Sequence, residues 1–181
     1  MDLVFSGNYH VNTMGNPTCF YITGMGGALD AGLGLALQDL SIKYSGLELS
    51  GNFLNLSVEE IRRSLHEKLL KFVKGGGEKL IAVSAGATLL LREMSLHSYP
   101  GLDVLMFSPS FFGRPLDTNP SRSLKIVSGS EDWYPPEEVI EDFIDTFPVF
   151  SFDLVEGAGH FLPHSIVREN IVALNDKSPR L

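Results

Sequence analysis

The sequence lacks the features that would point to a disulfide-bonded or membrane-spanning protein. Its 181 residues include a single cysteine, Cys19, so an internal disulfide and a cysteine-based metal site are both excluded. Cys19 lies in an apolar run, which favours a buried thiol over a reactive one. No stretch approaches the roughly 18 apolar residues of a membrane span. The first residues also lack the basic start and apolar core of a signal peptide. We therefore expect a cytoplasmic protein.

Basic residues are scarce as well. The chain has 14 Lys and Arg against 22 Asp and Glu, a net charge of -8. That sign is wrong for holding a phosphate backbone without a separate basic patch, and the sequence has no such patch. The one tight basic pair, Arg62 and Arg63, stands beside glutamates at helical spacing, which is typical of a solvated helix face. We expect no nucleic-acid partner.

Strand and helix signals alternate along the whole chain. With 44% hydrophobic residues, no internal repeat and no linker, the sequence predicts one domain over residues 1–181. The alternation predicts an α/β fold: a mostly parallel, doubly wound sheet with helices on both faces. The predicted strands are 18–23, 44–49, 80–83, 104–107, 124–127 and 149–155, with an antiparallel hairpin around Gly7 and Asn8. The predicted helices are 30–40, 57–73, 87–94, a helix after Pro136, and 165–174.

A serine stands at the end of the strand predicted at 80–83. Ser84 has small residues two positions before and after it, Ala82 and Gly86, and a predicted helix follows. A nucleophile on so sharp a turn needs small neighbours, because the strand and the helix approach closely there. The alternative interpretation is that Ser84 only caps the helix.

An aspartate and a histidine follow two later strands. Asp132 lies in the loop after the strand at 124–127, and His160 follows the glycines of Gly157-Ala158-Gly159 after the last strand. Because the carboxyl ends of parallel strands share one sheet edge, Ser84, Asp132 and His160 are expected to meet there. Taken singly, Asp132 is also typical of an ordinary acidic turn, and His160 of a surface or core histidine. His10, His66, His97 and His164 lack a comparable setting.

The order serine, aspartate, histidine, each at a predicted strand end, resembles the α/β-hydrolase superfamily in the motifs VSAGA, GSED and GAGH. The loop TGMGG after an early strand resembles the family more loosely. The resemblance implies that Ser84 is a nucleophile, His160 a general base and then acid, and Asp132 the group that orients the imidazole. It also implies an oxyanion hole made by the backbone N–H groups of Ala85 and Met25.

The resemblance implies a small-molecule acyl substrate, an ester or a thioester, and no cofactor or metal. Many members carry a lid between two of the later strands, but only residues 108–123 separate the corresponding strands here, so we expect no cap domain. An open, shallow pocket is expected, with Gly24, Phe111, Phe112 and Trp133 near the substrate. The oligomeric state is not indicated.

Two other functions compete with this interpretation. The run Gly24-Met25-Gly26-Gly27 is similar to a dinucleotide-binding loop, with Glu48 as a ribose partner. Leu29 argues against that function, because a glycine or alanine is needed at its position for the helix to pack on the strand. The other alternative is a non-catalytic binding module with the same fold.

Overall fold

The computed structural model describes residues 16–49, 57–110, 121–133, 137–146 and 150–176. The hairpin expected around Gly7 and Asn8 lies outside these ranges. The strands are β1 Cys19–Met25, β2 Tyr44–Leu49, β3 Lys79–Val83, β4 Tyr99–Phe107, β5 Ser121–Gly129 and β6 Phe150–Val155. The helices are α1 Leu33–Asp39, α2 Val58–Lys74, α3 Ala85–Met94, α4 Glu137–Thr146 and α5 His164–Asp176.

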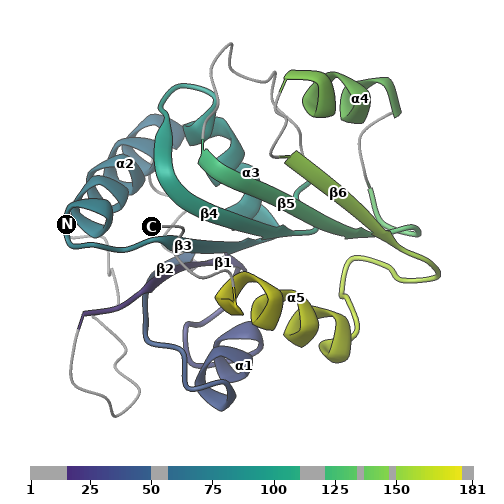
Figure 1. Cartoon of the computed structure of the whole chain (residues 1–181), viewed down its shortest axis with the longest axis horizontal. Coiled ribbons are helices and arrows are strands. Elements are labelled where there is room, and N and C mark those ends of the chain that lie inside the picture. The colour runs from purple at the N-terminus through teal and green to yellow at the C-terminus, as the bar shows by residue number, and fades with distance from the viewer. Residues whose placement is uncertain (1–15, 50–56, 111–120, 134–136, 147–149, 177–181) are drawn as a thin grey trace.

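The six strands form one parallel sheet in the order β2-β1-β3-β4-β5-β6. The chain therefore moves outward from β1 in one direction to β2 and in the other direction from β3 to β6. Between β1 and β3 the connections leave the sheet toward opposite faces, which opens a crevice at the carboxyl ends of these two strands. Figure 1 shows the twisted sheet with helices on both sides. The predicted mostly parallel, doubly wound fold is confirmed.

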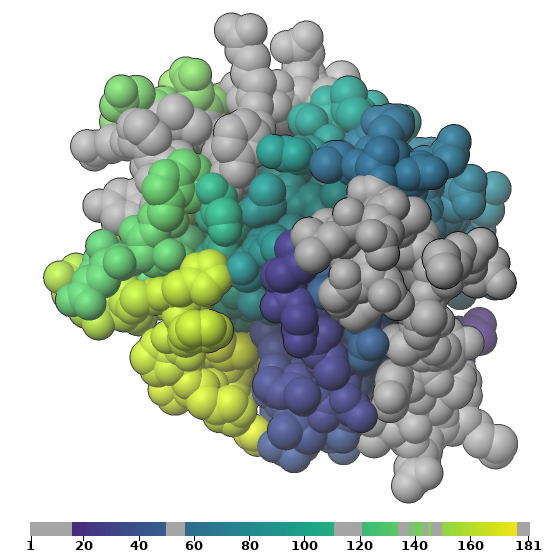
Figure 2. All heavy atoms as spheres, turned by 180° about the vertical axis from the view of Figure 1, so that it is seen from behind, coloured from purple at the N-terminus to yellow at the C-terminus, as the bar shows by residue number. Residues whose placement is uncertain are grey.

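Alternate strand residues face two separate hydrophobic cores. Phe20 and Ile22 of β1 pack with the apolar faces of α2 and α3, whereas Cys19 and Tyr21 pack with α1 and α5. This is the period-two alternation of a strand buried on both sides. The helices α1 and α5, far apart in sequence, consequently lie side by side on one face (Figures 1 and 2).

Local signals account for where the helices begin. Ser57 caps α2, and the reciprocal hydrogen bonds between Ser57 and Glu60 form the predicted capping box. Helix α1 is shorter than the predicted 30–40. It begins only after Gly32, which has a φ of 53°. Three residues before Gly32, Leu29 is held by Glu48, whose carboxylate accepts the Leu29 N–H at 2.8 Å.

Between β4 and β5 the chain has only residues 108–120, too few for a cap domain, as the sequence predicts. Within the described ranges, every helix is too short or too polar to cross a bilayer.

Candidate active site

Ser84 occupies a strained turn between β3 and α3. Its φ of 52° and ψ of -121° are values that residues with a Cβ rarely adopt. The side chain makes no capping hydrogen bond to α3, so the helix-cap interpretation of Ser84 is not supported. The Ser84 N–H donates to the carbonyl of Phe107 at 2.8 Å, which holds the turn against the end of β4.

The small residues around Ser84 are required by the packing of α3 against β1. A Cβ at Gly86 would lie 2.3 Å from the carbonyl oxygen of Thr23, a backbone atom that cannot rotate away. Ala82 is fully buried in β3. The small residues at 82 and 86 therefore reflect a close approach between α3 and β1. The turn between β3 and α3 leaves the Ser84 hydroxyl facing the sheet edge.

His160 lies between Ser84 and Asp132. Its Nε2 is 2.8 Å from the Ser84 Oγ, and its Nδ1 is 2.8 Å from Oδ2 of Asp132. Asp132 follows β5 and His160 follows β6, so three separate strand ends supply the group. The Asp132 side chain is 13% exposed and that of His160 is 35% exposed, which leaves the imidazole accessible from one side.

The loops that carry Asp132 and His160 are bound directly to each other. The Glu131 N–H donates to the carbonyl of Ala158, and the Gly157 N–H donates to the Ser130 hydroxyl, both at 2.9 Å. These two bonds fix the distance between the carboxylate and the imidazole through the backbone.

This arrangement indicates which nitrogen of His160 carries the proton. With Nδ1–H donating to the Asp132 carboxylate, Nε2 is left as an acceptor for the Ser84 hydroxyl. An imidazole so placed can remove the hydroxyl proton, and the carboxylate beside it stabilises the imidazolium that forms.

The carboxyl end of β1 and the loop that follows it run beside Ser84. A Cβ built on Gly24 would be 3.3 Å from the Cβ of Ser84, so the backbone of this loop lies close to the hydroxyl. Ala85 begins α3, where the first N–H groups have no acceptor within the helix. The oxyanion-hole role of Ala85 and Met25 stays a prediction.

Thr23 and Glu48 hold this loop in place. The Thr23 hydroxyl, fully buried, accepts the Leu49 N–H at 3.0 Å, and Glu48 accepts the Leu29 N–H. The carboxylate proposed as a ribose partner is thus bound to the protein's own backbone. Leu29 is itself fully buried. These contacts argue against a dinucleotide-binding function.

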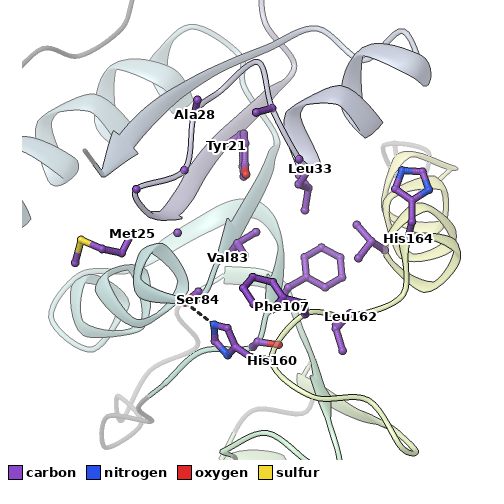
Figure 3. A pocket seen from close by; sticks show the side chains of 18 residues that line it. Tyr21, Met25, Ala28, Leu33, Val83, Ser84, Phe107, His160, Leu162 and His164 are labelled. Atoms are coloured by element: carbon purple, nitrogen blue, oxygen red, sulfur yellow. Dashed lines mark hydrogen bonds between the residues drawn. The ribbon is translucent and has the colours of Figure 1, made fainter. Parts of the chain in front are cut away.

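A cavity of about 590 Å³ opens beside Ser84 and His160. Figure 3 shows it between the β1–α1 segment and α5, with Tyr21, Val83 and Phe107 at its base and Leu33 and Leu162 on opposite sides. The helices α1 and α5 stand on either side of it, and the expected shallowness of the pocket stays a prediction.

Of the residues expected near the substrate, some line the cavity and others do not. Gly24 and Met25 line the cavity, and the Met25 side chain extends away from Leu33 and Leu162 in Figure 3. Trp133 is 48% exposed and does not line this cavity. Phe111 and Phe112 lie outside the described residues. Binding of the substrate by Trp133, Phe111 and Phe112 stays a prediction.

Sequence reasoning missed the walls contributed by the helices. Leu33 of α1 and Val167 of α5 line the cavity, as does His164 at the start of α5. Their spacing is that of ordinary amphipathic helices, so the sequence offered no signal that these helices meet near Ser84.

Solved structures with this architecture include hydrolases. The chain is similar to esterase PE8, with a TM-score of 0.66 and 16% identity over 92% of this chain and 95% of the other. It is similar to Est1E from Butyrivibrio proteoclasticus, with a TM-score of 0.64 and 13% identity over 92% and 91%. It is also similar to the monoacylglycerol lipase of Paleococcus ferrophilus, with a TM-score of 0.65 and 12% identity over 91% and 97%. No protein-family model and no curated protein matches the sequence.

Proposed function

Because the chain has the α/β-hydrolase fold, we propose that it is a serine hydrolase, with Ser84 as nucleophile, His160 as base and acid, and Asp132 as the orienting carboxylate. The observation that carries the proposal is the pair of hydrogen bonds that links the Ser84 Oγ through His160 to Asp132, each 2.8 Å long. A base held in this way activates a hydroxyl that is otherwise a weak nucleophile near neutral pH.

The reaction proceeds through an acyl-enzyme. The Ser84 Oγ attacks the carbonyl carbon of the substrate while its proton moves to Nε2 of His160. The carbonyl oxygen becomes an oxyanion, which the N–H groups of Ala85 and Met25 stabilise. The tetrahedral intermediate collapses as the C–O or C–S bond breaks, and His160 returns the proton to the leaving group. Water then repeats the sequence, releases the acid and restores Ser84.

The cavity supports an uncharged acyl group as the part of the substrate that is bound. Its lining includes apolar and aromatic side chains, namely Tyr21, Val83, Phe107, Leu33 and Leu162. A volume of about 590 Å³ lies within the range that small-molecule ligands occupy in proteins. We propose a small ester or thioester as the substrate. Action in the cytoplasm, with no nucleic-acid partner, stays a prediction from the sequence.

Labelling with a fluorophosphonate probe, together with hydrolysis of p-nitrophenyl esters, tests the proposal. The wild type should be labelled at Ser84 and should hydrolyse the esters. Ser84→Ala should lose the label and lower turnover on the order of a million-fold, as nucleophile removal does in a well-studied serine hydrolase. The matched control is Ser165→Ala, which removes an exposed hydroxyl of α5 that does not line the cavity.

A folded wild type that neither takes the label nor hydrolyses any ester or acyl-CoA thioester would contradict the proposal. It would favour the non-catalytic binding module, whose ligand would still occupy the same cavity. Equal labelling of the wild type and Ser84→Ala would exclude Ser84 as the nucleophile.

A further inference from the structure

Two histidines and a glutamate converge where α2 packs on the end of α3. His66 lies on α2, Glu93 lies near the end of α3, and His97 lies in the turn that follows (the helices are labelled in Figure 1). Each side chain offers one metal-ligating atom, and the three atoms lie within 4.8 Å of one another. The Nδ1 atoms of both histidines are 2.8 Å from the same oxygen, Oε1 of Glu93.

Hydrogen bonds alone do not satisfy this group. The Glu93 side chain is fully buried, and its Oε1 also accepts the Tyr99 hydroxyl at 2.6 Å. A carboxylate oxygen has two lone pairs, yet three polar atoms surround this one within 2.8 Å. The Nδ1 of His97 is buried and makes no hydrogen bond to any described residue, although it is close enough. The Nδ1 of His97 and the Oε1 of Glu93 are therefore close enough for a hydrogen bond but are not oriented to form one.

Among the described residues, the Arg62 guanidinium lies within ion-pair distance of the Glu93 carboxylate. Arg62 approaches the other carboxylate oxygen, Oε2, at 3.4 Å, and the same guanidinium is paired more closely with Glu59. The other oxygen, Oε1, faces the two imidazoles and the Tyr99 hydroxyl. The two imidazole rings lie 4.0 Å apart between centroids, a spacing at which two protonated rings would repel each other.

We propose that His66, Glu93 and His97 form a binding site for one divalent transition-metal ion, with zinc as the best match. Two imidazole nitrogens and one carboxylate oxygen are a ligand set typical of zinc, whereas calcium and magnesium prefer oxygen ligands alone. Water would supply the fourth ligand. The His66 and His97 side chains are 27% and 40% exposed, so an ion can reach the buried carboxylate from solvent.

The three ligand atoms would shift from their present spacing to accept the ion. Metal–ligand bonds of about 2.0–2.2 Å in a tetrahedral site hold the ligand atoms about 3.3–3.5 Å apart. The two Nδ1 atoms, now 2.8 Å from Oε1, would each move away from it by about half an ångström, and the three ligand atoms already lie within 4.8 Å of one another. The buried Nδ1 of His97 would then gain the partner it lacks.

The role of the ion is structural. Glu93 is nine positions beyond Ser84 along α3, a separation of about 14 Å at the helical rise. An ion there takes no part in the chemistry proposed at Ser84. It joins α2 to the end of α3 and to the turn before β4. The site therefore stands or falls independently of the proposed hydrolase function.

Zinc binding by the full chain, prepared without a histidine tag, tests the site. The wild type is expected to bind one zinc ion per chain in competition with a chromogenic chelator. His66→Gln and His97→Gln should each raise the dissociation constant for zinc at least about tenfold, because each removes a ligand. Excess zinc should raise the melting temperature of the wild type by roughly 5 °C and should raise that of His97→Gln by less. Cobalt in place of zinc should give the visible ligand-field bands of a four-coordinate site.

The controls separate this site from other histidines. His164→Gln removes a histidine of α5 outside the cluster and should bind zinc like the wild type. The partly exposed His66 and His97 are substituted rather than the buried Glu93, whose loss could prevent folding. Absence of stoichiometric zinc from the wild type, or wild-type affinity in both His66→Gln and His97→Gln, would overturn the proposal. So would loss of binding in His160→Gln, which would place the ion at the catalytic group instead.

Discussion

Replacing Gly129 by alanine should separate the loop of Asp132 from the loop of His160. Gly129 ends β5, and a Cβ on it would lie 2.1 Å from the carbonyl oxygen of Ala158 and 2.4 Å from that of Gly159. Both obstacles are backbone atoms of the segment that leads to His160. Because Cβ atoms essentially never approach other heavy atoms within 3.0 Å, the two loops must move apart.

The size of the effect follows from this geometry. Relieving the contact requires a shift of about 1 Å, and a misplacement of that size costs on the order of 10²-fold in catalysis. The shift lengthens the contact between His160 and Asp132, which is 2.8 Å in the structure. We expect kcat/KM for a small p-nitrophenyl ester to fall about 100-fold, because the segment that moves carries the imidazole of His160.

The assay is steady-state hydrolysis by the wild type, Gly129→Ala and a control, each checked by circular dichroism and thermal melting. The control is Gly101→Ala in β4, where a Cβ meets nothing within 4 Å. It should leave kcat/KM unchanged. A Gly129→Ala protein that is folded and within twofold of the wild type would refute the reasoning that the contact between these loops positions the imidazole.

Three further predictions concern Asp132, Cys19 and the core. Asp132→Asn should lower kcat on the order of 10⁴-fold, as the equivalent change does in a well-studied serine protease, and a loss below tenfold in steady-state assays would argue against its orienting role. Burial raises the pKa of the Cys19 thiol to about 12, so little thiolate exists at pH 8 and the native protein should resist a disulfide reagent that labels it after denaturation. Rapid labelling of native Cys19 would contradict its burial. Leu65→Ala, at a fully buried position of α2, should lower the free energy of unfolding in urea by about 2–5 kcal/mol. Leu70→Ala, at an exposed position of the same helix, should cost less than about 1 kcal/mol, and equal losses would contradict the assigned core face.

The fold and the three polar residues at its edge were within reach of the sequence. The buried strand before Ser84, the capping box at Ser57 and the alternation of strands with helices are local patterns, because hydrophobic period and capping depend on near neighbours. Parallel strands then bring their carboxyl ends to one edge, so the ends of β3, β5 and β6 place Ser84, Asp132 and His160 together.

What required the tertiary structure was which side chains of distant helices meet. The cavity depends on α1 and α5 packing side by side, and nothing in the spacing of Leu33 or Val167 distinguishes a cavity wall from an ordinary helix face. The cluster of His66, Glu93 and His97 likewise joins residues up to 31 positions apart. Local sequence patterns specify which face of a helix is apolar, whereas the side chains that meet across two helices are decided only when the helices pack.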